Sequence, residues 1–269
     1  MNLRRARYEA RRLLHSSGVR HPDHIDVEEI ARAYGVEIVF GKLDGAMARV
    51  MRFGSKVRIR VSDRITNPGA IRFSIAHELG HLVLGHEIPT EADVEQFLVR
   101  ACTRHRGDGD PEVEANAFAA ELLMPRWLVR RLCEISPVDL RPVHRIADDF
   151  RTSVVASAVR FAELTHERCA AVYSEHGSVK WMAKSPTFPW RIQRGTRLNA
   201  SSLAFGYFTK GCIEADPRPV PANTWLAGLS PSQQGADVVE HAELVPELDG
   251  VLSLVWIPGA TASRLGFGA

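Results

Sequence analysis

The chain of 269 residues is predicted to have an α+β fold in three parts. The first 125 residues combine helical periodicity with a group of short strand patterns, and residues 126–168 continue as helix. From about residue 169, Pro, Gly, Trp and short apolar runs dominate. We therefore expect an N-terminal domain over residues 1–125, a helical segment over residues 126–168 and a small strand-rich α/β domain over residues 169–269.

The N-terminal part is expected to combine a small sheet with several helices. A basic helix comes first, and Asp26 is the expected N-cap of the second. Residues 56–62 alternate basic with apolar residues, which is typical of a half-exposed strand. A turn is expected at residues 66–70, whereas Asp110 and Pro111 are typical of a helix start. The expected helices cover residues 3–17, 26–34, 71–86, 91–104 and 111–125, and the expected strands cover residues 36–41, 45–54 and 56–62.

Composition and charge exclude several classes of protein. The formal net charge is +2, so the chain as a whole is not an electrostatic ligand for nucleic acid or for a membrane. No apolar run approaches the roughly 18 residues of a membrane span, and the N-terminus lacks the apolar region of a signal peptide. The four cysteines are far apart and form no CxxC pair, so we expect reduced thiols in a cytoplasmic protein.

The stretch IRFSIAHELGHLVLGH, residues 71–86, places polar side chains in an otherwise apolar helix. His77 and His81 are four residues apart, so both rings project from one helix face. Two neutral imidazoles at this spacing can occupy two corners of a tetrahedral zinc site. Glu78 is turned roughly 100° around the helix from His77, so it can reach a metal-bound water without binding the metal. This HExxH arrangement predicts zinc ligation by the histidines and general-base catalysis by Glu78.

A catalytic zinc ion needs a third protein ligand, and the next strong helix offers one. Glu112 lies in the first turn of that helix, and Asn116 lies one turn later on the same face. We favour Glu112 as the third ligand and expect Asn116 to accept the hydrogen bond that orients a ligand histidine. Glu114, His86 and His105 are the alternative third ligands.

The alternative to a metal site is a set of core histidines satisfied by a structural salt bridge. Burying two imidazoles and a carboxylate without partners would cost several kcal/mol, and a bound metal ion removes that cost. A salt bridge would also remove it but requires more coincidences of placement, so we favour zinc. Manganese is a second candidate for the working ion, because a His/His/Glu set accommodates both metals.

The blocks RFSIAHELGHLVLGH and EVEANAFAAELLMP together resemble the ImmA/IrrE family of zinc metallopeptidases, which is of M78 type. The resemblance covers residues 5–165 and departs from the family pattern at Ser74, where Thr is more usual. It implies that the two histidines and Glu112 bind zinc and that Glu78 is the general base. It also implies a zincin-like, gluzincin-type domain made of a small sheet and the HExxH helix.

The same resemblance implies a metalloendopeptidase that cleaves a helix–turn–helix repressor of the Xre type and thereby releases its target genes in a stress response. The alternative is a regulatory, antitoxin-like zinc-binding protein that binds a repressor or toxin partner and cleaves slowly or not at all. The intact Glu78 favours the enzyme, because a structural zinc site does not need a general base. The strand around residues 45–50 is expected either to bind an extended substrate by edge addition or to serve the sheet alone.

Two weaker patterns lie further along the chain. Residues 143–164 resemble a helix–turn–helix with its turn at residues 151–153. We expect this segment to pack against the peptidase helices rather than bind DNA directly, because its second helix offers few groups that read base edges and Arg160 as its one basic residue. The aromatic residues of the C-terminal part are expected to be core, with a ligand-sensing pocket as the alternative.

Overall fold

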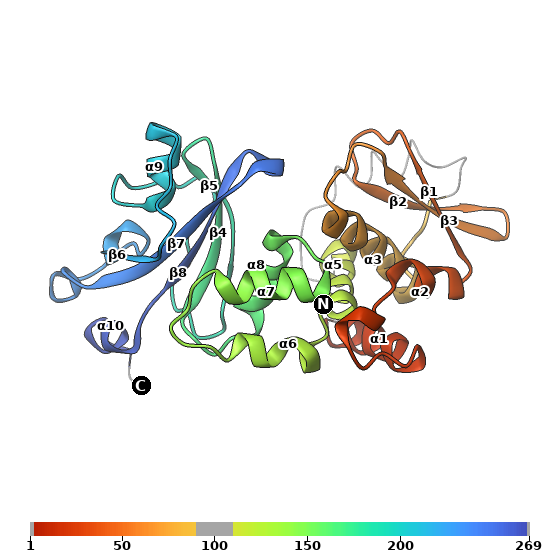
Figure 1. The fold of residues 1–269 in the computed structure, drawn as a ribbon, viewed down its shortest axis with the longest axis horizontal. Coiled ribbons are helices and arrows are strands. Elements are labelled where there is room, and N and C mark those ends of the chain that lie inside the picture. The colour runs from red at the N-terminus through yellow and green to blue at the C-terminus, as the bar shows by residue number, and fades with distance from the viewer. Residues whose placement is uncertain (1–2, 90–109, 268–269) are drawn as a thin grey trace. The chain divides into compact units, whose positions relative to one another are not determined.

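The computed structural model describes residues 3–89 and 110–267 as a mixed α+β structure with two sheets (Figure 1). The predicted α+β class is confirmed. The chain divides into two compact units: unit 1 comprises Met1–Leu128 and Ala147–Ser153, and unit 2 comprises Val129–Ile146 and Val154–Ala269. The helix predicted at residues 91–104 and the candidate ligand His105 lie outside the described residues.

Unit 1 contains a three-stranded sheet together with helices α1, α2, α3 and α5. Strand β3 lies between its neighbours, parallel to β1 and antiparallel to β2, so β2 is an edge strand. The helices are α1 (Leu3–Ser16), α2 (Val27–Ala33), α3 (Pro68–Leu84) and α5 (Pro111–Leu123), and the strands are β1 (Val36–Gly41), β2 (Ala48–Phe53) and β3 (Lys56–Ser62).

Helix α3 begins earlier than the sequence predicts. The turn predicted at residues 66–70 is wrong in its second half, because α3 already begins at Pro68. The side chain of Asn67 accepts a hydrogen bond from the Ala70 N–H at 3.0 Å, and proline fits the first turn because that turn leaves its N–H groups unpaired. A Cβ at Gly69 would lie 2.4 Å from the Ser153 backbone nitrogen, so only glycine allows the helix to begin against this segment.

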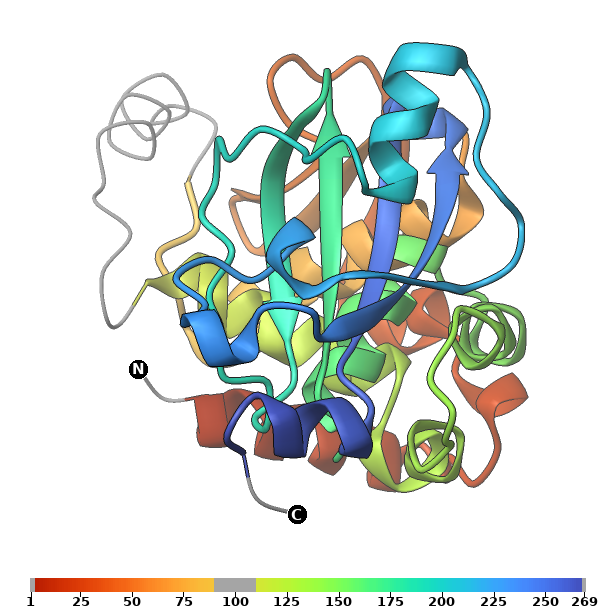
Figure 2. The same ribbon diagram turned by 90° about the vertical axis from the view of Figure 1, so that its left-hand side faces the viewer.

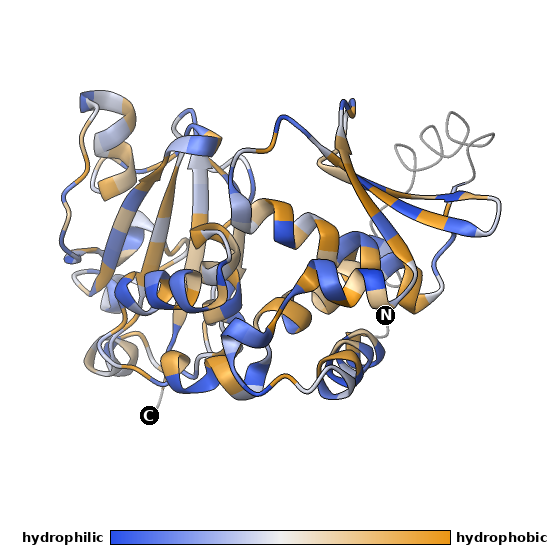
Figure 3. Ribbon diagram, turned by 45° about the vertical axis from the view of Figure 1, so that its right-hand side comes forward, coloured by the Kyte–Doolittle hydropathy of each residue, from blue (hydrophilic) through white to orange (hydrophobic). Residues whose placement is uncertain are grey.

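Strand β3 buries one face and half-exposes the other, and Figure 3 shows hydrophobic and hydrophilic residues alternating along the strands of this sheet. Along β3, Val57, Ile59 and Val61 are buried, whereas Arg58 and Arg60 are only half-buried. The buried face packs on α3, which contacts both β2 and β3. This alternation confirms the prediction of a half-exposed strand, because successive side chains of a strand point to opposite faces.

Helices α3 and α5 pack closely because α3 carries a glycine at the contact. A Cβ at Gly80 would lie 3.0 Å from Cδ1 of Phe118 and 3.3 Å from Cα of Ala115. All three residues are buried, so the contact belongs to the core of unit 1. A larger residue at Gly80 would push the helices apart, because protein cores have few voids to absorb extra atoms.

The basic helix α1 contacts α3 and α5 through two of its arginines. The guanidinium of Arg5 donates a hydrogen bond to the carbonyl of Leu84 at 3.0 Å, at the last residue of α3. The Nε of Arg11 lies 2.7 Å from Oε1 of Glu121, whose side chain on α5 is buried. A cation at the C-terminus of a helix interacts favourably with the partial negative charge there, so Arg5 stabilises the end of α3.

Unit 2 is built on a five-stranded antiparallel sheet in the order β5-β4-β8-β7-β6. Helices α9 and α10 lie on one face of this sheet, the face turned to the viewer in Figure 2. Residues from both helices share a buried apolar cluster with the strands, which confirms a strand-rich C-terminal part. The elements are β4 (Cys169–Glu175), β5 (Ser178–Lys184), α9 (Leu203–Lys210), β6 (Arg218–Pro221), β7 (Asp237–Val245), β8 (Gly250–Trp256) and α10 (Gly259–Arg264).

A fully buried carboxylate, Glu240 on β7, joins several segments of unit 2. Its two oxygens accept five hydrogen bonds, from the hydroxyls of Ser202 and Ser253, the indole N–H of Trp225 and the backbone N–H groups of Leu203 and Ala204. The two backbone donors belong to the first turn of α9, where the helix dipole favours a negative charge. The hydrogen bonds replace the water that the carboxylate loses on burial.

The predicted helical segment contains α6 (Arg126–Cys133), α7 (Arg141–Phe150) and α8 (Val154–Leu164). Between α7 and α8, Arg151 adopts a left-handed conformation with φ 53°, where the turn was expected. The helix–turn–helix interpretation of these residues stays a prediction. The side chain of Arg160 is only 1% exposed, so the basic group that the sequence offers for a DNA contact lies inside the protein.

Among the described residues, no helix combines the length and the apolar character needed to cross a membrane. The cysteines in this part of the chain, Cys133, Cys169 and Cys212, are free thiols.

We expect Gly80→Val to destabilise unit 1 by about 2 kcal/mol, because its side chain would overpack the contact between α3 and α5. Chemical denaturation followed by circular dichroism measures this loss. Gly41→Val is the matched control, since a Cβ at Gly41 meets no atom within 4 Å. Equal stability of the two variants would show that the close helix contact is not a constraint.

Candidate metal centre

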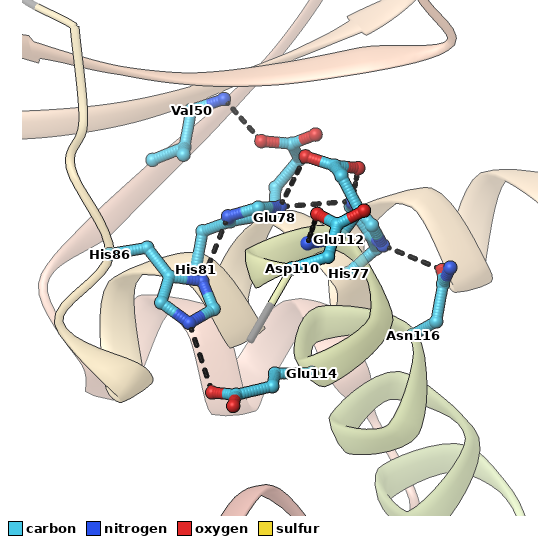
Figure 4. Close-up of polar contacts among 9 residues, drawn as sticks. All are labelled: Val50, His77, Glu78, His81, His86, Asp110, Glu112, Glu114 and Asn116. Atoms are coloured by element: carbon cyan, nitrogen blue, oxygen red, sulfur yellow. Dashed lines mark hydrogen bonds and ion pairs between the residues drawn. The ribbon is translucent and has the colours of Figure 1, made fainter. Parts of the chain in front are cut away.

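The candidate site lies where α3 and α5 pack together in unit 1 (Figure 4). Helix α3 carries the two histidines and Glu78, and α5 carries Glu112 and Asn116. The side chain of Asp110 accepts a hydrogen bond from the Glu112 N–H at 3.0 Å, which begins α5 and fixes Glu112 in its first turn. The structure thus brings the sequence-predicted residues from two helices to one place.

The donor atoms of His77, His81 and Glu112 have the mutual spacing of metal ligands. The Nε2 atoms of the two histidines are 3.1 Å apart. Oxygens of Glu112 lie 3.2 Å from His77 Nε2 and 3.4 Å from His81 Nε2. Tetrahedral zinc with bonds of about 2.0–2.1 Å places its ligand atoms roughly 3.3–3.4 Å apart. One ligand atom of each side chain lies within 4.8 Å of the others, so the three side chains fit a zinc ion, which would take water or substrate as its fourth ligand.

Asn116 lies where it can orient the first histidine. Its Oδ1 is 2.9 Å from Nδ1 of His77. An amide oxygen only accepts, so Nδ1 of His77 carries the hydrogen and Nε2 keeps the lone pair that a metal needs. This placement agrees with the role expected for Asn116, and the same kind of partner holds ligand histidines in known metal sites.

His86 and Glu114, two alternative third ligands, lie behind the second histidine instead. Nδ1 of His86 is 3.0 Å from Nδ1 of His81, and Nε2 of His86 is 3.5 Å from Oε2 of Glu114. Both side chains are nearly buried, at 11% and 13% exposure. If His81 donates to His86, then His86 carries its hydrogen on Nε2, facing Glu114. This chain of contacts leaves Nε2 of His81 free of hydrogen for a metal ion.

The end of α3 positions His86 for this contact. Gly85 has φ 71°, a left-handed conformation that favours glycine. The N–H of Gly85 donates to the Leu82 carbonyl at 3.2 Å, and the N–H of His86 donates to the His81 carbonyl at 3.0 Å. These bonds form a Schellman motif, which turns the chain back over the last turn of the helix. In the sequence, this turn is indicated by a glycine that follows the helix and is itself followed directly by histidine.

Glu78 is half-buried between α3 and the edge strand β2. Its Oε2 accepts a hydrogen bond from the backbone N–H of Val50 at 2.7 Å. Burial raises the pKa of Glu78 above its ordinary value, although the charge of His77, the Val50 N–H and the charge of Arg49 act in the opposite direction. A carboxylate with a raised pKa is a better proton acceptor near neutral pH.

The two candidate ligand histidines differ in their proton affinity. Burial alone would lower the pKa of His77, but the hydrogen bond with Glu112 and the nearby carboxylate charges raise it. Burial and the charge of His77 lower the pKa of His81 to about 4. The hydrogen bond with His77 lowers the pKa of Glu112. In the metal-free protein, the proton that zinc must displace is therefore held mainly by His77.

We expect His86→Ala to weaken zinc binding by about 10–100-fold, because His81 loses the partner that sets its tautomer and orientation. Competition with a chromophoric chelator measures the affinity. His24→Ala, in the short 3-10 helix Pro22–His24, removes an imidazole elsewhere in unit 1 and serves as the control. Unchanged affinity in His86→Ala would show that the contact with His81 is incidental.

We also expect zinc to raise the melting temperature of the chain at neutral pH, and removal of zinc by a chelator to reverse the rise. The effect should fade as the pH falls through the raised pKa of His77, because a protonated imidazole cannot bind the metal. Differential scanning calorimetry across pH, with His77→Ala as the variant that lacks the effect, checks this. A rise that is independent of pH and of His77 would place zinc elsewhere.

Comparison with known proteins gives one family match and a similar fold. A solved structure of a Mycobacterium tuberculosis transcriptional regulator superposes with a TM-score of 0.56 at 14% sequence identity, covering 97% of this chain and 78% of that chain. At this identity the likeness concerns the fold alone. No curated protein matches the chain.

The family match covers the residues that build the candidate metal centre. The IrrE N-terminal-like domain of the Peptidase_M78 family matches residues 31–162, which include both α3 and α5. Residues 31–162 therefore form an IrrE N-terminal-like domain of the Peptidase_M78 family.

Proposed function

We propose that unit 1 is a zinc-dependent endopeptidase that hydrolyses a peptide bond in a protein substrate. The observation that carries the proposal is the position of Glu78, a half-buried carboxylate beside three side chains whose ligand atoms lie close together. A structural metal site would not need this carboxylate, whereas peptide hydrolysis needs a proton acceptor. The family, whose members are described as peptidases, supports the same reaction class.

The ion and the protein side chains have separate tasks in this proposal. Zinc, when bound by His77, His81 and Glu112, supplies a Lewis acid that acidifies water and polarises the scissile carbonyl. Manganese is the alternative ion for the same ligands. Glu78 takes a proton from the attacking water and passes it to the leaving nitrogen. The Val50 N–H holds Oε2 of Glu78, so Oε1 is the oxygen that moves the proton.

The edge of β2 offers a place for an extended substrate. The N–H groups of Val50 and Arg52 both point away from β3, since they donate to Glu78 and to the Pro89 carbonyl. Alternate residues of an antiparallel strand turn their backbone groups to the same side, so Ala48 faces this edge as well. Because the N–H groups of Val50 and Arg52 are already paired, we propose that a substrate segment pairs with this edge at Ala48, beside Glu78, as extended peptides do at other open sheet edges.

We further propose that the substrate is a helix–turn–helix repressor of the Xre type in the cytoplasm, whose cleavage releases its target genes. The resemblance of the two sequence blocks supports this substrate class. The similar solved structure is named a transcriptional regulator, which agrees with a regulatory role. The competing function is a regulatory zinc protein that binds a repressor or toxin without cutting it.

A cleavage assay tests the proposal. The purified full chain, loaded with zinc or manganese, is incubated with the Xre-type repressor encoded nearest to its gene, and fragments are read by intact mass. We expect a discrete cut whose rate falls at least about a hundredfold in Glu78→Gln, because that variant keeps the ligands but loses the proton acceptor.

The outcomes separate the two functions. Equal cutting by Glu78→Gln and the unchanged protein would remove Glu78 from the mechanism. No cut with either metal, together with a stable complex of the two proteins, would favour the binding protein over the enzyme.

A further inference from the structure

The outer face of the three-stranded sheet carries two arginines directly opposite each other. Arg49 on β2 is the cross-strand partner of Arg60 on β3. Both are half-buried and lie on the face away from α3, because their neighbours Val50 and Ile59 face the core. Like charges in directly opposite positions of a sheet repel each other and destabilise the pairing.

No carboxylate in the described part of the chain contacts this pair directly, although the charge of Arg49 acts to lower the pKa of Glu78. The nearby Arg58 shows the contrast, since its guanidinium contacts Glu37 Oε2 at 2.7 Å and lies 5.0 Å from the ring centroid of Phe53. Among residues 3–89 and 110–267, Arg49 and Arg60 make no hydrogen bond or ion pair with a carboxylate, and the buried Nε of Arg60 has no hydrogen-bond partner. A buried donor without an acceptor costs free energy, so an acceptor that reached Nε of Arg60 would be favoured.

The pair lies at the edge that the proposed substrate occupies. Arg49 directly precedes Val50, whose N–H holds Glu78. In a sheet, directly opposite residues on neighbouring strands point their side chains to the same face. A peptide residue opposite Arg49 on the open side of β2 would therefore place its side chain beside Arg49, with Arg60 one strand further away on the same face.

We propose that Arg49 and Arg60 form a receptor for the carboxylate of an Asp or Glu side chain in an extended peptide bound along β2. Two guanidinium groups supply planar donors that match a carboxylate, and such charge-assisted hydrogen bonds are stronger than neutral ones. An acid beside Arg49 would also weaken the repulsion between the two arginines across β2 and β3. This inference rests on the proposed peptidase function and specifies its substrate as acidic near the scissile bond.

Binding and cleavage are measured separately with the full zinc-loaded chain. The probes are short fluorescein-labelled peptides of alanine, serine and leucine that carry Glu, Gln or Lys at one position in turn. Fluorescence anisotropy with Glu78→Gln reports binding, and mass spectrometry with the unchanged protein reports cleavage. At one peptide position, we expect Glu to be favoured over Gln by about tenfold in both readouts, as for hydrogen bonds between charged groups.

Two variants assign the preference to this pair. Arg49→Gln should remove the tenfold preference in both readouts, and Arg49→Glu should favour Lys at the same position. Lys56→Gln is the matched control, because it removes the same charge from the same face of β3 at a distance of about 13 Å along the strand. Circular dichroism checks the fold, and Arg60→Gln gives a second test if Arg49→Glu does not fold.

The results distinguish this inference from the proposed function. Cleavage without any preference for an acid, or a preference that Lys56→Gln also removes, would overturn the inference and leave the peptidase proposal standing. A preference in binding that depends on Arg49, with no cleavage of any peptide, would uphold the acidic receptor and overturn the peptidase proposal.

Discussion

The candidate centre depends on the close packing of α3 against α5. Helix α3 contributes two donor atoms and α5 contributes the third, so the spacing of the three follows directly from the distance between the helices. That distance is set at Gly80, where even a methyl group would approach Phe118 to 3.0 Å. A separation larger by a few tenths of an ångström would spoil the 3.1–3.4 Å spacing that suits zinc. The glycine inside the HELGH motif is therefore a packing requirement as much as the histidines are a chemical one.

Contacts behind the donor atoms keep this geometry in place before any ion arrives. Asn116 fixes the first histidine, while His86 and Glu114 lie behind the second. The capped C-terminus of α3, held by Arg5, prevents the last turn from fraying and so holds His86 in position. An organised set of ligands loses little conformational freedom on binding, which is the usual route to tight binding.

Sequence reasoning reached the parts of the site that depend on helix periodicity. The i, i+4 spacing predicted His77 and His81 as metal ligands. The position of Glu112 and Asn116 on one helix face predicted the third ligand and the residue that orients a histidine. Both predictions rest on helix geometry, which repeats regardless of surroundings. The contact between His86 and Glu114 was missed because it needs both the turn at Gly85 and the distance between two helices. The contact of Glu78 with Val50 was missed for a similar reason, since it joins a helix to the edge of a sheet whose strand order no local pattern reveals. Arg160 looked like a surface charge because burial of a long polar residue is decided by tertiary packing.

In unit 2, the buried carboxylate of Glu240 affects how the segments around it unfold locally. Its five hydrogen-bond donors come from the start of α9, from Trp225 and from β8, which are distant from one another in the chain. Local release of any of these segments would leave a buried charge with fewer partners, so partial opening is disfavoured until water reaches the carboxylate itself. The amide hydrogens of these segments should therefore exchange with solvent together, as one cooperative unit, rather than in separate steps.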